Sequence, residues 1–148
     1  MIPLDGTLEQ VLAHVPREVT MAELKSPHLY RRHDVAGRTA EVLSERDVVL
    51  SFSRRALLVA KRRRPDLRVL QHVGVGVSIR AASSYAWGVG FWDPRVTARG
   101  LSKSRKLGLA TTVYTVNDPD RMRALCRLGV DGIFTDCPDR ARAAMRPR

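Results

Sequence analysis

The chain has 148 residues, of which 44% are hydrophobic and 28% are charged, so its composition favours one globular domain and excludes wholesale disorder. Lys and Arg number 26 against 15 Asp and Glu, and the resulting net charge of +11 indicates an anionic partner without identifying it. The two cysteines, Cys126 and Cys137, lack the spacing of zinc ligands. Because no apolar run approaches ~18 residues and no signal-peptide pattern opens the chain, we expect a cytoplasmic protein with no membrane span.

Helical and strand patterns alternate along the first half of the chain. The stretch TLEQVLAHV predicts an amphipathic helix with Val15 on its apolar face, and Thr7 and Gln10 at its start form a capping box. The residue Ser53 has the position of a helix cap. The expected elements are a helix over 7–15, a strand from Val19, a helix over 35–45, the strand VVLSF from Val48 and a helix after Ser53.

The same alternation continues in the second half. The expected order is the strand RVLQHV (68–73), an unpatterned segment that includes SIRAASSY (78–85), the strand AWGVGFW (86–92), the helix TARGLSKSRKLG (97–108), the strand LATTVYTV (109–116), a helix capped by Asp118 and ended by Gly129, the strand VDGIFTD (130–136) and a closing helix from Pro138. Met122, Leu125 and Cys126 supply the apolar face of the penultimate helix. The pattern predicts an α/β fold, either an open doubly wound sheet or part of a (β/α) barrel.

Three stretches of the sequence resemble the glycerophosphodiester phosphodiesterase family. The ending YTVND…MRALCRLGVDGIFTDCPD is similar to that family's closing strand–helix–strand unit, with Tyr114 in place of the usual tryptophan. The start, IPLDGTLEQVLAHVPREVTMAELKSP, resembles the family's Ile-Pro-Thr-Leu helix and the following strand that ends in Glu-x-Lys. Between them, VVLSFS resembles the strand whose Ser-Phe precedes a helix.

The resemblance implies a (β/α) TIM-type barrel that hydrolyses glycerophosphodiesters to glycerol 3-phosphate and an alcohol with a divalent metal, Mg²⁺ or Ca²⁺. In the family, strands that end in His-Arg-Gly and Glu-x-Asp precede the Ile-Pro-Thr-Leu helix, where this chain begins. A complete barrel needs about 250 residues. We therefore expect residues 1–148 to form a single partial barrel domain, truncated at its N-terminus, with about six of the eight strand–helix units.

The resemblance also implies roles for three residues. Glu23 would be a catalytic carboxylate and a metal ligand, and Lys25, two residues further on, would direct its ammonium to the substrate phosphate. Tyr114 would line the substrate pocket, as Trp92 could, although aromatic residues on such strands more often pack in a core. An alternative is that Glu23 and Lys25 form an ion pair that only satisfies neighbouring charges.

The four histidines do not match the family's two acid–base positions. His14, His28 and His33 are expected on the surface, and His72 is either a hydrogen-bonded structural residue or a residue at the barrel mouth. Asp136 is expected to cap the closing helix.

Without the Glu-x-Asp carboxylates and the two catalytic histidines, the chain alone is expected to lack a complete site, because Mg²⁺ and Ca²⁺ seek several oxygen donors. The metal would then bind only once those ligands are supplied. A rival hypothesis is a non-catalytic barrel remnant that binds an anionic ligand or a protein partner, with self-association or a partner covering its open edges. The hypothesis of a nucleic-acid partner is supported by charge alone, and we do not expect one. The basic run KRRRPDLR (61–68) has no interleaved aromatic residues and is interpreted as a solvated helix end.

Overall fold

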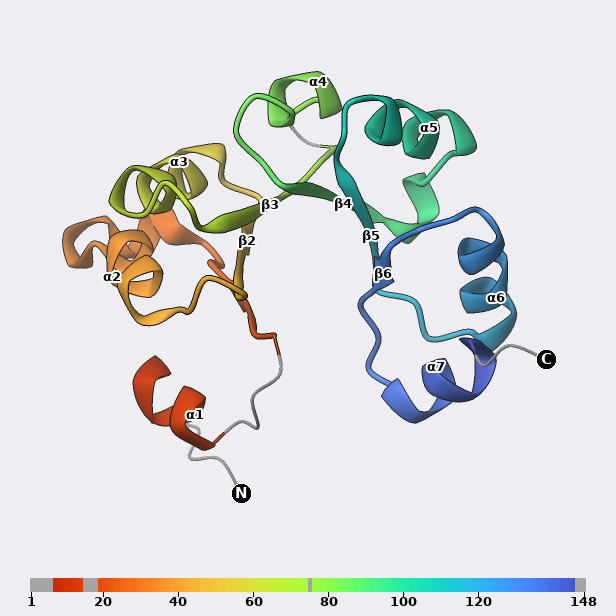
Figure 1. Cartoon of the computed structure of the whole chain (residues 1–148), viewed down its shortest axis with the longest axis horizontal. Coiled ribbons are helices and arrows are strands. Elements are labelled where there is room, and N and C mark those ends of the chain that lie inside the picture. Colours follow the sequence, from red (N-terminus) through yellow and green to blue (C-terminus); the bar gives the residue numbers. More distant parts are fainter. Residues whose placement is uncertain (1–6, 15–18, 75, 146–148) are drawn as a thin grey trace. The chain divides into compact units, whose positions relative to one another are not determined.

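The computed structural model describes residues 7–14, 19–74 and 76–145, in which strands and helices alternate from one end to the other (Figure 1). Residue contacts divide the chain into two compact units, with the boundary between Val69 and Leu70. The predicted alternation is confirmed. The extent of the domain as a single unit over residues 1–148 stays a prediction.

The first unit is built around a parallel pair of strands. Its elements are α1 (Leu8–His14), β1 (Met21–Glu23), the 3-10 helix η1 (Pro27–His33), α2 (Val35–Val42), β2 (Val48–Ser51) and α3 (Arg54–Arg63). Glu23 lies opposite Leu50 in the register of β1 and β2. The capping box of α1 is confirmed, because the Thr7 amide donates to Gln10 Oε1 at 2.7 Å and the Gln10 amide to Thr7 Oγ1 at 3.4 Å. The predicted helical position of Val15 falls outside the described residues.

Two arginines of the basic run after Lys61 contact the neighbouring helix α2. The Arg63 guanidinium pairs with Glu41 at 3.0 Å and with Asp34 at 3.4 Å, and both partners belong to the start or body of α2. Arg64 donates to the carbonyls of Ala40, at 3.3 Å, and Leu43. Arg63 is exposed, as expected of a solvated helix end, and Arg64 is half-buried; through these contacts both arginines also join α3 to α2.

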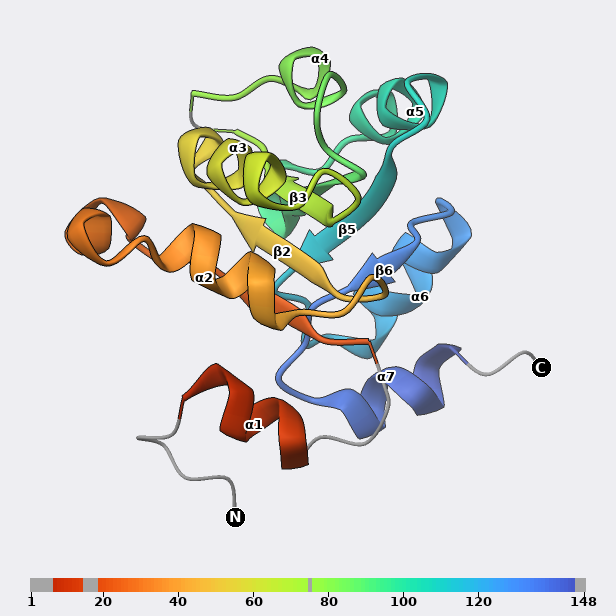
Figure 2. The ribbon, with the colours of Figure 1, turned by 60° about the vertical axis from the view of Figure 1, so that its left-hand side comes forward.

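The second unit contains four parallel strands in sequence order. Its elements are β3 (Arg68–His72, whose first two residues belong to the first unit), α4 (Ile79–Ala82), β4 (Gly88–Trp92), the 3-10 helix η2 (Asp93–Arg95), α5 (Ala98–Lys106), β5 (Ala110–Tyr114), α6 (Pro119–Arg127), β6 (Gly132–Ile133) and α7 (Pro138–Met145). The strands β3, β4, β5 and β6 pair with their neighbours, and β5 and β6 run side by side in Figure 2.

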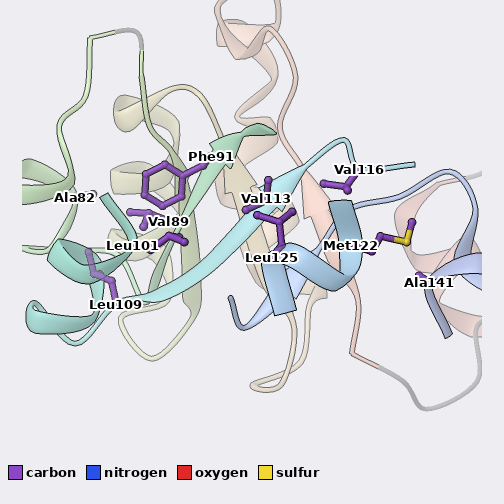
Figure 3. Close-up of a cluster of buried hydrophobic side chains, with 10 residues drawn as sticks. All are labelled: Ala82, Val89, Phe91, Leu101, Leu109, Val113, Val116, Met122, Leu125 and Ala141. Carbon is purple, nitrogen blue, oxygen red and sulfur yellow. The ribbon is translucent and has the colours of Figure 1, made fainter. Parts of the chain in front are cut away.

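The helices cover one face of this four-stranded sheet. Val89 and Val113 are fully buried in a cluster with Leu101 of α5 and with Met122 and Leu125 of α6 (Figure 3). Because side chains alternate between the faces of a strand, the residues adjacent to Val89 in β4 and to Val113 in β5 belong to the opposite face. That second face carries Gly90, Thr112 and Tyr114, together with His72, which lies opposite Gly90 in the register of β3 and β4.

Three local expectations need correction. The segment SIRAASSY contains the one-turn helix α4, which begins where the Ser78 hydroxyl accepts a hydrogen bond from the Ala81 amide at 3.1 Å. Cys126 is exposed and contributes nothing to the buried face of α6. The strand β6 has two residues, shorter than the stretch VDGIFTD suggests.

None of the helices in the described ranges has the length and the apolar character needed to cross a membrane.

Candidate functional site

Glu23 and Lys25 lie together where β1 ends. Glu23 is the last residue of the strand, and its Oε2 atom lies 3.8 Å from the Lys25 Nζ atom. The Glu23 side chain is 29% exposed and the Lys25 side chain 80%. An ion pair this long and this exposed contributes at most about 1 kcal/mol to stability, so both charges are available to a ligand.

The backbone between these two residues is fixed by the neighbouring strand. The Leu24 amide donates to the Leu50 carbonyl at 2.9 Å, and the buried Ser51 hydroxyl donates to the Leu24 carbonyl at 2.8 Å. The same hydroxyl accepts from the Ser53 amide at 3.0 Å, immediately before α3. One serine of the VVLSFS stretch thus ties the end of β1 to the start of α3 and limits where Glu23 and Lys25 can point.

A small hollow of about 160 Å³ lies in the same unit, beginning two residues after Lys25. It is lined by residues of η1 and of the first turns of α2 and α3, among them His28, Tyr30, Asp34, Ser53 and Arg55. Ligand pockets usually have volumes of about 300 Å³ or more, so this hollow suits only a small group. Its charges are mixed, because Asp34 and Arg55 are both in its lining.

In the second unit, His72 and Tyr114 meet on the sheet face opposite the helices. Their ring centroids lie 4.3 Å apart in an edge-to-face arrangement, and the His72 and Phe134 rings are 6.1 Å apart. His72 is 4% exposed, and its burial lowers its pKa to about 4. The imidazole is therefore neutral at pH 7, as expected of a structural histidine, and His14, His28 and His33 are exposed as predicted.

Trp92 lies opposite Tyr114 in the register of β4 and β5, at the carboxyl end of both strands. It is 47% exposed, and the Arg95 guanidinium carbon lies 5.5 Å from the centre of its ring. The expectation that Trp92 packs in a core is wrong. Next to it, Arg121 Nε donates to Asp93 Oδ1 at 2.7 Å and joins α6 to the segment that follows β4.

Asn117 connects the segments that follow β5 and β6. Its side-chain oxygen accepts hydrogen bonds from the Asp136 amide at 2.9 Å and the Thr135 hydroxyl at 3.0 Å, while its amide nitrogen donates to Asp136 Oδ2 at 2.8 Å. The expected capping role of Asp136 is not supported, because α7 begins at Pro138 and Cys137, not Asp136, directly precedes it. We call these hydrogen bonds the Asn117–Asp136 clamp. Its residues belong to the sequence blocks YTVND and GIFTDCPD, but the sequence does not show that these blocks face each other.

The described residues do not form a complete metal site. They contain no group of three or more His, Cys, Asp or Glu side chains that could hold an ion. Glu23 offers a single carboxylate with an ammonium 3.8 Å away, whereas Mg²⁺ and Ca²⁺ take six or more oxygen ligands. The roles assigned from sequence to Glu23, Lys25 and Tyr114 stay predictions. The structure brings Glu23 and Lys25 together, and Tyr114 belongs to the other unit.

Comparisons with known proteins agree with this architecture. The model of the glycerophosphoryl diester phosphodiesterase family matches residues 7–140. A glycerophosphodiester phosphodiesterase of Bacillus subtilis (strain 168) is 26% identical over 152 aligned positions, which cover 90% of this chain and 51% of that protein.

Solved structures show the same fold. A glycerophosphodiester phosphodiesterase from Parabacteroides distasonis matches with a TM-score of 0.72 and 23% identity, over 84% of this chain and 56% of that one. An Oleispira antarctica phosphodiesterase, solved in complex with the product sn-glycerol-3-phosphate, matches with a TM-score of 0.71 and 22% identity, over 83% of this chain and 53% of that one. The expected (β/α) TIM-type fold is confirmed, and this chain spans about half the length of these relatives.

Proposed function

Because the chain belongs to the glycerophosphoryl diester phosphodiesterase family, we propose that it takes part in the hydrolysis of glycerophosphodiesters to glycerol 3-phosphate and an alcohol. The observation that carries the proposal is the Glu23–Lys25 pair at the carboxyl end of β1. Enzymes with (β/α) barrels place their catalytic residues at this end of the strands. The product named for the Oleispira antarctica relative, sn-glycerol-3-phosphate, supports this substrate class.

The reaction adds water across a P–O bond, so that the phosphorus gains a hydroxyl and the departing alcohol gains a proton. Negative charge grows on the phosphate oxygens and on the leaving oxygen as the bond breaks. The Lys25 ammonium, 80% exposed at the end of the strand, would bind and stabilise the phosphate oxygens. Glu23, whose Oε2 atom lies 3.8 Å from the Lys25 Nζ atom, would contribute one oxygen ligand to a cation.

A divalent cation would supply charge neutralisation and lower the pKa of a bound water. We propose Glu23 as one ligand of such an ion, Mg²⁺ or Ca²⁺. The other ligands would come from residues outside the described part of the chain, because this part offers a single carboxylate here. We therefore expect no hydrolysis by the chain alone and metal-dependent hydrolysis when the family's opening strands are supplied.

The test joins the chain to the opening segment of the Bacillus subtilis relative and measures release of glycerol 3-phosphate from glycerophosphocholine with Mg²⁺, Ca²⁺ or a chelator. Glu23→Gln should lower the activity steeply and raise the metal concentration needed. Lys25→Met should lower kcat by ~10²-fold or more with little change in metal affinity. Glu41→Gln is the matched control, because Glu41 also pairs with a cation but lies on α2, away from the end of β1.

Wild-type activity in both Glu23→Gln and Lys25→Met, with the fold intact by circular dichroism, would remove the pair from the site. The rival function is binding of an anionic ligand without catalysis, favoured by the net charge of +11 and by the single carboxylate. It predicts that glycerol 3-phosphate binds in a Lys25-dependent way while the joined protein hydrolyses nothing.

A further inference from the structure

The amino ends of the strands in the second unit present an apolar and basic surface. Because β4, β5 and β6 are parallel, the residues that precede them lie at one edge of the sheet. The Ala110 amide donates to the Trp87 carbonyl at 3.2 Å, and the Asp131 amide donates to the Thr111 carbonyl at 2.9 Å. The amino ends of the three strands are therefore adjacent. We call this surface the amino-edge patch; it comprises Trp87, Arg105, Lys106, Leu107, Arg127 and Leu128.

Two of the apolar residues of the patch, Leu107 and Leu128, follow helices that end in the same way. The helix α5 is followed by Leu107 and Gly108, and α6 by Leu128 and Gly129, with a cation as the last helical residue in each case. The glycines have φ values of 70° and 72°, a conformation that ends helices and that favours glycine. Each leucine is 38% exposed at the end of its helix, and Trp87 is 40% exposed.

The two helix ends form one continuous surface. A Cβ atom on Gly129 would lie 3.0 Å from Arg105 Nη1, so the guanidinium at the end of α5 lies against the turn that follows α6. This contact places the Arg105 guanidinium beside Gly129, directly after Arg127 and Leu128, while Lys106 and Leu107 follow Arg105 at the end of α5. The apolar and basic residues of the patch are therefore intermixed.

The patch has an excess of positive charge. Arg105, Lys106 and Arg127 form no ion pair with any residue in the described ranges. The Asp131 carboxylate, just before β6, accepts hydrogen bonds from the Thr111 amide at 2.7 Å and the Thr111 hydroxyl at 2.8 Å, and forms no ion pair with these cations. The three cations are thus available to an anionic partner.

We propose that the amino-edge patch docks the protein on an anionic phospholipid bilayer. The cations would contact lipid phosphates and carboxylates, while Leu107 and Leu128 would enter the boundary between headgroups and acyl chains. Trp87 has the mixed apolar and polar character that places tryptophan at membrane interfaces. Nucleic acid would also satisfy the cations, but it gives no apolar environment to two exposed leucines, so the bilayer fits the whole patch better. The proposal does not rest on the proposed hydrolase activity.

The two tryptophans of the chain give a direct test, because they mark opposite ends of β4. Trp87 lies in the patch, and Trp92 lies five residues further along the strand, about 16 Å away. The variant Trp92→Phe leaves Trp87 as the fluorophore, and Trp87→Phe leaves Trp92. With vesicles of phosphatidylcholine and phosphatidylserine, the emission of Trp87 should shift to shorter wavelength and that of Trp92 should not. A shift of Trp92 alone, or binding that leaves Trp87 unchanged, would overturn the proposal.

Charge removal tests the cations. The triple variant Arg105→Gln, Lys106→Gln, Arg127→Gln should weaken vesicle binding on the order of 100-fold, since each basic residue near an anionic surface contributes about fivefold. The control, Arg99→Gln, Arg140→Gln, Arg142→Gln, removes three exposed cations outside the patch and should weaken binding far less. The variant Leu107→Ser, Leu128→Ser should lose the part of the binding that survives high salt. Circular dichroism verifies that each variant is folded.

Equal losses in the patch and control triple variants would mean that the net charge alone attracts the protein, and would overturn the proposal. So would the absence of binding to anionic vesicles, or equal binding to vesicles of phosphatidylcholine alone. Binding to a single-stranded oligonucleotide that requires Arg105, Lys106 and Arg127, without vesicle binding, would assign the patch to nucleic acid instead. A second copy of the chain as the occupant would appear as patch-dependent self-association in sedimentation.

Discussion

His72 should make the second unit less stable as the pH falls below 7. The imidazole is buried against Tyr114, and burial lowers its pKa to about 4 from an ordinary value of 6.5. In the unfolded chain the same group takes up a proton near pH 6.5, whereas the folded chain resists protonation until about pH 4. The unfolded state therefore binds more protons in this window, and its free energy falls relative to the folded state as the pH decreases.

The two pKa values set the size of the effect. The free energy of unfolding should fall by at most about 2.4 kcal/mol between pH 7 and pH 4.5, because each unit of pKa difference corresponds to about 1.4 kcal/mol. With a urea dependence of about 2 kcal/mol per molar, the unfolding midpoint moves by about 1 M. Tryptophan fluorescence is the suitable probe, because Trp87 and Trp92 both belong to the unit that contains His72.

The control is His72→Gln, which removes the titrating group and keeps a polar side chain of similar size. The carboxylate of Asp47 titrates below the pH range in which His72 acts. Burial raises the pKa of Asp47, but hydrogen bonds from Thr20 and Ser44 outweigh burial and lower this pKa below 3.8. Its contribution to stability is present above pH 3.8 and is lost as the pH falls further, outside the window of His72. Identical pH dependence of unfolding in the wild type and in His72→Gln between pH 7 and 4.5 would refute the reasoning.

Three further outcomes follow from single contacts in the second unit. Gly90→Ala should lower the free energy of unfolding in urea by about 1–3 kcal/mol, because the new Cβ would lie 2.4 Å from His72 Nδ1. The double variant with His72→Ala should lose less stability than the sum of the two single variants, and additive losses would contradict the contact. Asn117→Ala should speed amide exchange at Asp136, whose N–H donates to the Asn117 side chain, and unchanged exchange would show that this clamp does not hold the segment. Met122→Ala should cost about 2–5 kcal/mol, whereas Cys126→Ala on the same helix should change stability by less than about 0.5 kcal/mol, and comparable losses would contradict their different burial.

The helices and strands are predictable from the sequence because their signals are local. Thr7 with Gln10, Ser53, and Asp118 before Pro119 mark helix starts through contacts within four residues, and all three caps are formed. The helix α4 was missed because a single turn has too few residues to show a period. Cys126 was misplaced because cysteine is usually buried, a tendency that says nothing about where this helix face ends.

The candidate site was only partly predictable, because its contacts join residues far apart in the sequence. Glu23 and Lys25 were found together since two residues separate them, and a family motif marked both. The Asn117–Asp136 clamp spans 19 positions and the Asp93–Arg121 pair spans 28, so only the parallel register brings each set together. His72 shows the same limit: its sequence position allows either a structural or a site role, and its burial beside Tyr114 depends on contacts that the sequence does not show.

The arrangement around Leu24 explains how a weak ion pair can still be held in a defined place. The Glu23–Lys25 contact itself contributes at most about 1 kcal/mol, which is too little to order two long side chains. The buried Ser51 hydroxyl, in contrast, donates to the Leu24 carbonyl at 2.8 Å in a buried hydrogen bond and accepts from the Ser53 amide at 3.0 Å in a partly buried one. A buried hydrogen bond costs about 1–3 kcal/mol when one partner is left unpaired, so the backbone on either side of Leu24 resists displacement. The fold thus fixes the positions from which Glu23 and Lys25 project while leaving their charged ends open to a ligand.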